Sequence, residues 1–160
     1  MNCHRRMANL RALSLLLGVL AAGACPAAEP ATSSPAVKIP ESPKESNMWM
    51  TINERRFAIA PADNDAARAF AAQLPLTLQM EDLNGNEKHA KLPASLPAHA
   101  SRPGIIRDGD LMLYGADTLV VFYLTFNSIY SYTRIGRVDD ASGLAQALGA
   151  GTARITFSKQ

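Results

Sequence analysis

The stretch DGDLMLYGADTLVVFYLTF, residues 108–126, decides the fold class of this chain. Two short turns rich in glycine and aspartate, 108–110 and 115–117, enclose the segment LMLY, which has the length and composition of a β-strand. Residues 118–126 follow, with apolar side chains at most positions and many β-branched or aromatic residues. Because both faces of such a strand are apolar, we predict a central strand that is buried on two sides.

Towards the carboxyl terminus, three more elements follow this central strand. IYSYTRIGRV (129–138) predicts another strand, and ARITFS (153–158) predicts a closing one. Between them, ASGLAQALG (141–149) predicts a short helix, with two leucines one turn apart and Gly149 as its C-cap. This half of the chain is therefore mainly β.

Towards the amino terminus, we predict a hairpin, a helix and one short strand. MWMTIN and RRFAIA, within 48–60, alternate on either side of a tight reversal and predict the hairpin. Residues 61–75 predict a helix with Asp63 or Asn64 as its N-cap, apolar residues at helical spacing and a proline as its stop. LTLQM (76–80) predicts a short strand.

Residues 81–104 contain three prolines and two glycines and show little regular pattern. We expect a long loop that covers a groove or packs as a crossover. The Asn-Gly-Asn sequence at 84–86 is first a turn signal, and the alternative is that Asn86 lines a groove. About eight short strands and two helices are expected in all, and a closed or nearly closed barrel leaves the fewest strand edges exposed. We therefore predict one mainly β domain over residues 48–160.

The same segments carry a resemblance to a known family. NGNEK (84–88), GDLMLYG (109–115), LVVFY (119–123), YSYTRIG (130–136) and GRVDDASGLAQAL (136–148) resemble the bacterial cyclophilin-like proteins, small domains that are often exported and have no assigned activity. The resemblance extends from Trp49 to Phe157. It implies a cyclophilin-like closed β-barrel of about eight strands with two short helices at its ends.

The resemblance also implies two kinds of function. A cyclophilin-like domain can be a module that binds a peptide or small ligand, or, as the alternative, a divergent peptidyl-prolyl cis-trans isomerase. True cyclophilins use an arginine in a Phe-His-Arg strand motif to donate to the amide region, and no Phe-His-Arg occurs in this chain. Arg55 and Arg56 are the arginines nearest the early strands, but they lie beside a hairpin turn. Whether the protein is an enzyme is therefore left open.

The amino terminus has the pattern of an exported protein. Three arginines precede the uncharged apolar run from Leu13 to Ala24, which is shorter than the roughly 20 residues that span a bilayer, so residues 1–24 are predicted to be a signal peptide. Cys25 follows small residues and is a candidate lipidation site, with plain cleavage at Ala24 or nearer Ala28 as the alternative. Residues 25–47 are rich in proline and serine and predict a disordered tether. We expect a periplasmic protein, or one anchored to the cell envelope through a lipid on Cys25.

Charge and composition exclude several classes of partner. The leader holds three of the 16 basic residues and none of the 14 acidic ones, so the remainder has 13 against 14 and a net charge of about −1, which argues against nucleic acid. His89 and His99 lack the spacing of a zinc site, and no phosphate-binding or dinucleotide-binding motif is present. We therefore expect no metal and no cofactor, and a monomer.

The candidate ligand-binding residues lie on the predicted late strands. Tyr132 and Arg134 are two residues apart and share a face, whereas Arg137 is expected on the other face. Together they predict an aromatic pocket with one cationic donor, suited to a peptide or a small carboxylate, whose further members are Tyr114, Tyr123, Phe126 and Tyr130. The alternative is that Arg134 lies at the rim of the barrel, stacked on tyrosines or paired with Asp139 or Asp140.

Overall fold

The computed structural model describes residues 48–160; the predicted leader, the lipidation candidate Cys25 and the tether lie outside the described residues. The described part contains two helices, α1 (Asp65–Ala72) and α2 (Leu144–Leu148), and ten strands: β1 (Met48–Ile52), β2 (Arg55–Pro61), β3 (Leu76–Leu83), β4 (Glu87–Lys91), β5 (Gly104–Ile106), β6 (Asp110–Tyr114), β7 (Thr118–Phe122), β8 (Phe126–Ser128), β9 (Thr133–Val138) and β10 (Ala153–Lys159).

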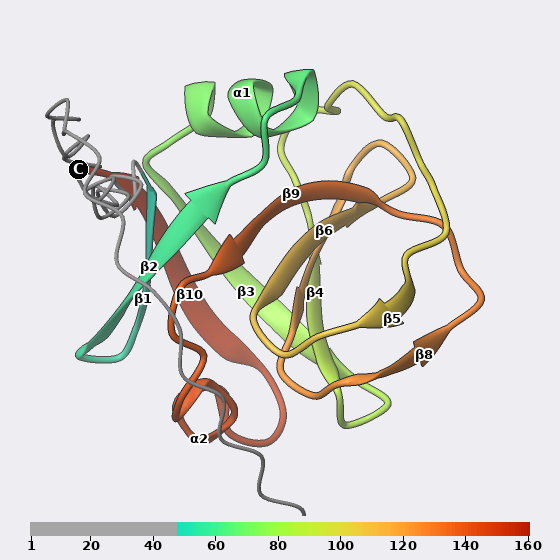
Figure 1. Ribbon diagram of the computed structural model, residues 1–160. Coiled ribbons are helices and arrows are strands. Elements are labelled where there is room, and N and C mark those ends of the chain that lie inside the picture. The colour runs from blue at the N-terminus through green and yellow to red at the C-terminus, as the bar shows by residue number, and fades with distance from the viewer. Residues whose placement is uncertain (1–47) are drawn as a thin grey trace, which may run out of the picture. The chain divides into compact units, whose positions relative to one another are not determined.

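Eight of these strands close into one antiparallel barrel in the order β1-β10-β3-β4-β7-β6-β9-β2 (Figure 1). Side chains that alternate along each strand fill its interior, as the closed-barrel geometry requires. Met50, Ile59, Leu113, Val121 and Ile155 are examples, each fully buried in one continuous apolar core. The predicted mainly β, cyclophilin-like barrel of eight strands with two helices is confirmed.

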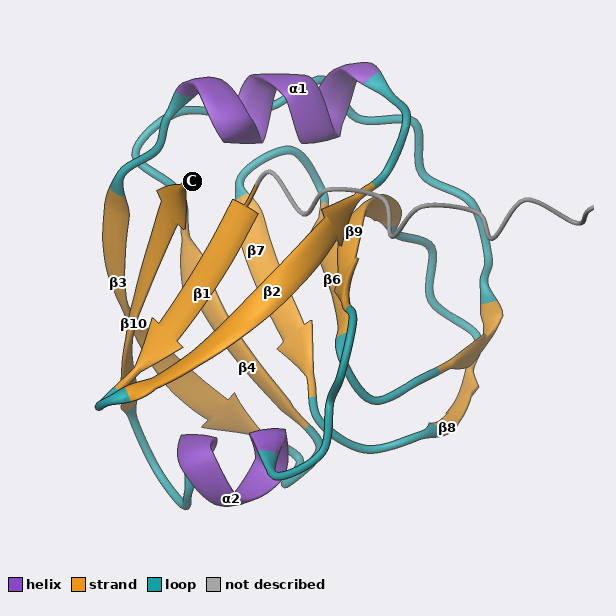
Figure 2. Ribbon diagram, turned by 60° about the vertical axis from the view of Figure 1, so that its left-hand side comes forward, coloured by secondary structure: helices purple, strands orange, loops and turns teal. Residues whose placement is uncertain are grey.

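The two helices cover opposite ends of the barrel (Figure 2). Asn64 is the N-cap of α1, and its Oδ1 accepts a hydrogen bond of 2.8 Å from the backbone N–H of Ala67. The helix buries Phe70, whose ring meets that of Phe157 edge to face at a centroid distance of 5.5 Å. Helix α2 is shorter than the predicted 141–149, but Gly149 is its C-cap, as expected. Neither helix of the described part is long and apolar enough to cross a membrane.

The prediction of a loop over residues 81–104 is wrong for residues 81–91, which form a hairpin, whereas residues 92–103 contain no helix or strand, as expected. Strand β3 continues to Leu83, and the chain then turns through Asn84 (φ 56°) and Gly85 (φ 68°) into β4, with Leu83 paired to Glu87. Asparagine and glycine accept this left-handed backbone with little strain, so the turn closes a hairpin. Strand β4 (EKHAK) carries charged residues on both faces and has no apolar alternation, which is why a hydrophobic pattern did not reveal it.

Two predicted strands are also interrupted. The strand predicted over 118–126 ends at Phe122, and after a short connection the chain forms β8, which pairs with β5 in a separate two-stranded sheet outside the barrel (Figure 1). The strand predicted over 129–138 begins only at Thr133, and Tyr132 before it forms a single bridge with Ser101. Short-range pattern does not distinguish one strand from two that belong to different sheets.

A β-bulge between β6 and β9 corrects the predicted face of Arg137. Asp110 pairs with Arg137 and Leu111 with Gly136, but Met112 pairs with Arg134, so Leu111 and Met112 of β6 oppose three residues of β9. Because directly opposed residues share a face, and Asp110 and Met112 share one, Arg134 and Arg137 both lie on the outer face of the barrel. The simple alternation of a regular strand therefore fails here.

Candidate functional site

A second apolar cluster lies on the outer face of the barrel, where β6 and β7 are covered by β5, β8 and the chain that follows β8. Its buried members are Ile106, Met112, Val120, Phe122 and Tyr132, with Phe126 packed against them. The ring of Phe122 lies 5.4 Å from that of Tyr132 and 5.7 Å from that of Phe126, measured between centroids. Strand β7 is thus apolar on both faces because it separates two cores, as its sequence predicted.

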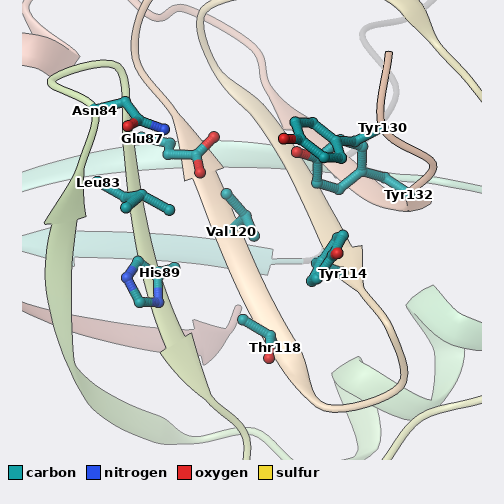
Figure 3. Close-up of a pocket in the computed structure, with 9 residues that line it drawn as sticks. All are labelled: Leu83, Asn84, Glu87, His89, Tyr114, Thr118, Val120, Tyr130 and Tyr132. Atoms are coloured by element: carbon teal, nitrogen blue, oxygen red, sulfur yellow. The ribbon is translucent and has the colours of Figure 1, made fainter. Parts of the chain in front are cut away.

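A cavity of about 360 Å³ opens at the edge of this outer cluster (Figure 3). The β3-β4 hairpin forms one wall, the outer face of β7 forms the floor, and tyrosines form the opposite wall. The residues that line it are Leu83, Asn84, Glu87, His89, Tyr114, Thr118, Val120, Tyr130 and Tyr132. The volume lies within the range of sites that hold small organic ligands.

Three tyrosines supply the aromatic wall. Tyr132 is buried at its base, whereas Tyr114 and Tyr130 are 50% and 59% exposed at its mouth. The ring of Tyr114 lies 5.7 Å from that of Tyr132 and 6.5 Å from that of Tyr130. Burial, and to a smaller extent the negative charge of Glu87, raises the pKa of the Tyr132 hydroxyl, so this tyrosine stays neutral.

Glu87 is the acidic residue of the cavity and was not predicted from the sequence. Glu87 is only 8% exposed, yet its carboxylate forms no hydrogen bond or ion pair with any residue of the described part. Figure 3 shows the side chain extending from β4 across β7 towards the tyrosine side. Burial, followed by the nearby charge of Asp82, raises the pKa of Glu87. The Asn-Gly turn signal at residues 84 and 85 was the sequence feature that could have revealed β4, the strand that carries Glu87.

Lys88 projects from β4 in the opposite direction and is fully buried. Its Nζ donates to Asp82 Oδ2 at 2.6 Å and to the carbonyl oxygens of Gly149 and Gly151 at 2.8 Å and 2.6 Å. The hydroxyl of Tyr123 donates to the same carboxylate oxygen at 2.6 Å. The hydrogen bonds from Lys88 and then Tyr123 lower the pKa of Asp82. This network joins β3, β4 and the end of α2, which gives it a structural role.

Burial and then the hydrogen bond to Asp82 raise the pKa of Tyr123 to about 12. Tyr123 therefore stays protonated as a donor in this network and does not line the cavity. The sequence placed Tyr123 in the aromatic pocket because it lies on a strand beside the other tyrosines. The structure separates it from them.

Arg134 likewise lies away from the cavity. Its Nη1 donates to Asp110 Oδ1 at 2.8 Å, so its partner is Asp110 and neither Asp139 nor Asp140. The Asp110 side chain is only 1% exposed, whereas that of Arg134 is 43% exposed. Asp110 Oδ2 also accepts a hydrogen bond of 2.9 Å from the backbone N–H of Arg107. The arginine therefore compensates a buried carboxylate on the outer face.

The sequence profile of the cyclophilin-like family matches residues 50–158, nearly the whole of the described domain. The chain belongs to the cyclophilin-like family. No curated protein matches the chain. Among solved structures, it is similar to the solution structure of a hypothetical protein from Archaeoglobus fulgidus, with 13% sequence identity and a TM-score of 0.47, over 76% of this chain and 100% of that chain.

Some of the residues predicted for the site line the cavity of this cyclophilin-like domain, and the others do not. Tyr114, Tyr130 and Tyr132 line one cavity. Phe126 packs in the apolar cluster behind it. Asn86 lies at the hairpin turn, where its backbone carbonyl accepts from the N–H of Tyr123 at 3.0 Å and its buried side-chain oxygen has no hydrogen-bond partner in the described part.

No arginine lines the cavity of this cyclophilin-like domain. Arg55 donates to the carbonyl oxygens of Gly143 and Ser142 at the start of α2, and the guanidinium of Arg56 lies 4.0 Å from the centroid of the Trp49 ring. Within residues 48–160, no three side chains of the histidine, cysteine, aspartate or glutamate type gather as a metal site. The polar chemistry offered by the cavity is one carboxyl group, one imidazole, three phenol rings, the carboxamide of Asn84 and the hydroxyl of Thr118.

Proposed function

We propose that this cyclophilin-like domain is a binding module that holds a small molecule or a peptide side chain in the cavity between the β3-β4 hairpin and the three tyrosines. The observation that carries the proposal is Glu87, a residue that is only 8% exposed and whose carboxyl group faces an open cavity without a protein partner in the described part. Burying such a group disfavours folding unless something pairs with it, and a bound ligand would supply the missing partner.

The surroundings of Glu87 support a binding role. The walls are mainly apolar and aromatic, with few polar groups, as is usual in sites for small organic ligands. Tyr114 and Tyr130 remain exposed at the mouth, so a ligand that enters would cover apolar ring surface that now faces water. The carboxyl group and the tyrosine hydroxyls would then fix its orientation.

Native mass spectrometry of the full chain, after incubation with a small-molecule extract of its own cells, tests this proposal. We expect a bound mass on the wild-type protein that is lost in Tyr114→Ala and retained in Leu124→Ala. Leu124 is exposed to a similar degree but does not line the cavity, so it is a matched control. A wild-type protein that takes up no ligand, or a bound mass that Tyr114→Ala leaves unchanged, would contradict the assignment.

Prolyl isomerisation is the alternative activity for a cyclophilin-like domain, and a protease-coupled peptide assay separates it from binding. Since no arginine faces the cavity, we expect no acceleration above the spontaneous rate, whose barrier is about 18–20 kcal/mol. Acceleration that Tyr114→Ala abolishes would make this cavity an isomerase site instead.

We further propose that the domain acts after export, at the cell envelope. The support is the charged and apolar pattern of residues 1–24 and the small residues before Cys25. The intact mass of the native protein tests this: a chain that begins at Cys25 and carries a diacylglyceryl group is expected. A chain that keeps residues 1–24 would contradict export, and an unmodified Cys25 would contradict lipidation alone.

A further inference from the structure

We infer that the ligand of this cavity is an organic cation, an ammonium group on an apolar body, held by the carboxylate of Glu87 and the rings of Tyr114, Tyr130 and Tyr132. The inference rests on the proposed binding function because both concern the same cavity. It reverses the ligand charge expected from the pocket hypothesis of the sequence analysis, in which Arg134 is the cationic donor for a peptide or a small carboxylate.

The charged residues around the cavity determine this reversal. No lysine or arginine is among its nine lining residues, and Glu87 is its only carboxyl group. Lys88 is adjacent in sequence, but its ammonium group lies on the other side of β4 with three oxygen partners. The guanidinium of Arg134 is engaged with Asp110. An anionic ligand would therefore meet a buried carboxylate and no cation from either residue.

The other buried acid of the described domain shows what Glu87 lacks. Asp110 is also buried, and its two oxygens accept hydrogen bonds from the Arg134 guanidinium and the Arg107 backbone. Glu87 is also buried, although less completely (8% against 0% exposed), and has neither kind of donor. An ammonium ligand would give it the charge-assisted hydrogen bond that Asp110 already has within the fold.

The aromatic wall suits the same ligand. The face of a phenol ring carries negative electrostatic potential, and several rings around one site attract a desolvated cation. The three tyrosines approach one another with centroid distances of 5.7 Å and 6.5 Å, so they form one continuous wall. The described residues contain no group of three metal-ligating side chains, and this favours an organic cation over a metal ion.

Binding of a cation should release a proton. Burial raises the pKa of Glu87, and a bound ammonium group would favour its ionised form. The titratable groups that share the cavity with Glu87 are His89 on its own strand and the tyrosines Tyr114, Tyr130 and Tyr132. Asp82 on β3 and Tyr123 after β7 lie with Lys88 on the other side of β4 and interact with Glu87 electrostatically. Asp82 is the acid whose charge opposes the ionisation of Glu87, and it stays paired with Lys88.

The test is calorimetric titration of the full chain with three probes of the same shape: 2-phenylethylammonium, 2-phenylethanol and 3-phenylpropanoate. We compare the wild type with Glu87→Gln and with Glu81→Gln. Glu81 is an exposed acid on the same outer face of the β3-β4 hairpin, but it does not line the cavity. Near-ultraviolet circular dichroism confirms that each variant is folded.

We expect the ammonium probe to bind the wild type and Glu81→Gln about tenfold more tightly than the alcohol, a difference of about 1.4 kcal/mol. Glu87→Gln should lose this preference while remaining folded. At a pH between the ordinary and the raised pKa of Glu87, titrations of the wild type in two buffers with different heats of ionisation should show proton release.

The possible failures distinguish the two proposals. If the alcohol or the carboxylate binds at least as tightly as the ammonium probe, and Tyr114→Ala abolishes that binding, the cation inference is overturned while the binding function stands. If none of the three probes binds, the cation inference is again overturned, and the bound mass in native mass spectrometry decides the binding function. Binding that neither Tyr114→Ala nor Glu87→Gln affects would contradict both proposals, because the ligand would then bind outside this cavity.

Discussion

Glu87 and Lys88 are neighbours in β4, carry opposite charges and are both buried, but their surroundings are opposite. Lys88 lies on the inner side, where its ammonium group donates hydrogen bonds to one carboxylate oxygen and two carbonyl oxygens. Glu87 lies on the outer side, across the cavity from the tyrosines, with no partner among the described residues. A strand sends consecutive side chains to opposite faces, so one residue of separation divides a structural charge from a candidate binding charge.

The comparison teaches that burial alone does not identify a functional charge. Both residues are buried, and what separates them is whether the fold itself satisfies their hydrogen-bonding groups. A buried charge whose hydrogen bonds are satisfied within the fold, such as Lys88, has a structural role. An unsatisfied one that faces a cavity indicates a partner from outside the fold. Three variants test this distinction, taken in order of expected effect.

Lys88→Met should have the largest effect on stability. The substitution keeps the volume but leaves the carbonyl oxygens of Gly149 and Gly151 without their donor and removes the ion pair to Asp82. We expect the free energy of unfolding in urea to fall by about 3 kcal/mol. Lys91→Met on the same strand, whose exposed ammonium group pairs with Asp117, is the control and should change it by less than about 0.5 kcal/mol. If Lys88→Met were as stable as Lys91→Met, the buried network would not stabilise the barrel.

Arg134→Gln should have an intermediate effect, because it deprives the buried Asp110 of its cationic partner but leaves the hydrogen bond from the Arg107 backbone. We expect a loss of about 2 kcal/mol in the free energy of unfolding, with ligand affinity unchanged. Arg137→Gln is the control, since that guanidinium donates only a long bond of 3.4 Å to the carbonyl of Asp108. A folded Arg134→Gln protein that no longer binds its ligand would restore the arginine to the site, as the sequence predicted.

Glu87→Gln should have the smallest effect on stability, and its sign should depend on pH. Since the folded pKa of Glu87 is raised, the folded state holds this proton at pH values where the unfolded state has lost it. The contribution of Glu87 to the free energy of unfolding therefore falls as pH rises from its ordinary pKa through the raised one. Relative to the wild type, Glu87→Gln should gain stability above that interval, by about 0.5 kcal/mol, in urea unfolding.

Glu81→Gln provides the reference for that pH series, because Glu81 is exposed on the same face. Its difference from the wild type should not vary across the interval in which Glu87 titrates. A Glu87→Gln variant that is less stable than the wild type at high pH would show that the carboxylate has a stabilising partner, and the contrast with Lys88 would fail.

Most of the fold was predictable from local patterns. The hairpin of β1 and β2, the cap of α1 at Asn64 and the doubly buried β7 each depend on residues close together in the chain. Tyr114 and Tyr132 were also predicted for the site, since aromatic residues on neighbouring strands tend to gather. Strand β4 was missed because its charged residues show no apolar alternation, although the turn before it, at Asn84-Gly85, was recognised as a turn signal.

The sequence by itself determined the family, the mainly β barrel and the aromatic character of the candidate site, because strand alternation, turn residues and helix caps act over a few residues. Only the tertiary structure decided which charged residue lines the candidate site. Two of the three oxygen partners of Lys88 are more than 60 residues away in the chain, and Arg134 finds Asp110 across a bulged pair of strands. Which charge is paired and which stays free depends on how the strands close on one another. As a result of this closure, Glu87 lines the cavity and Arg134 does not.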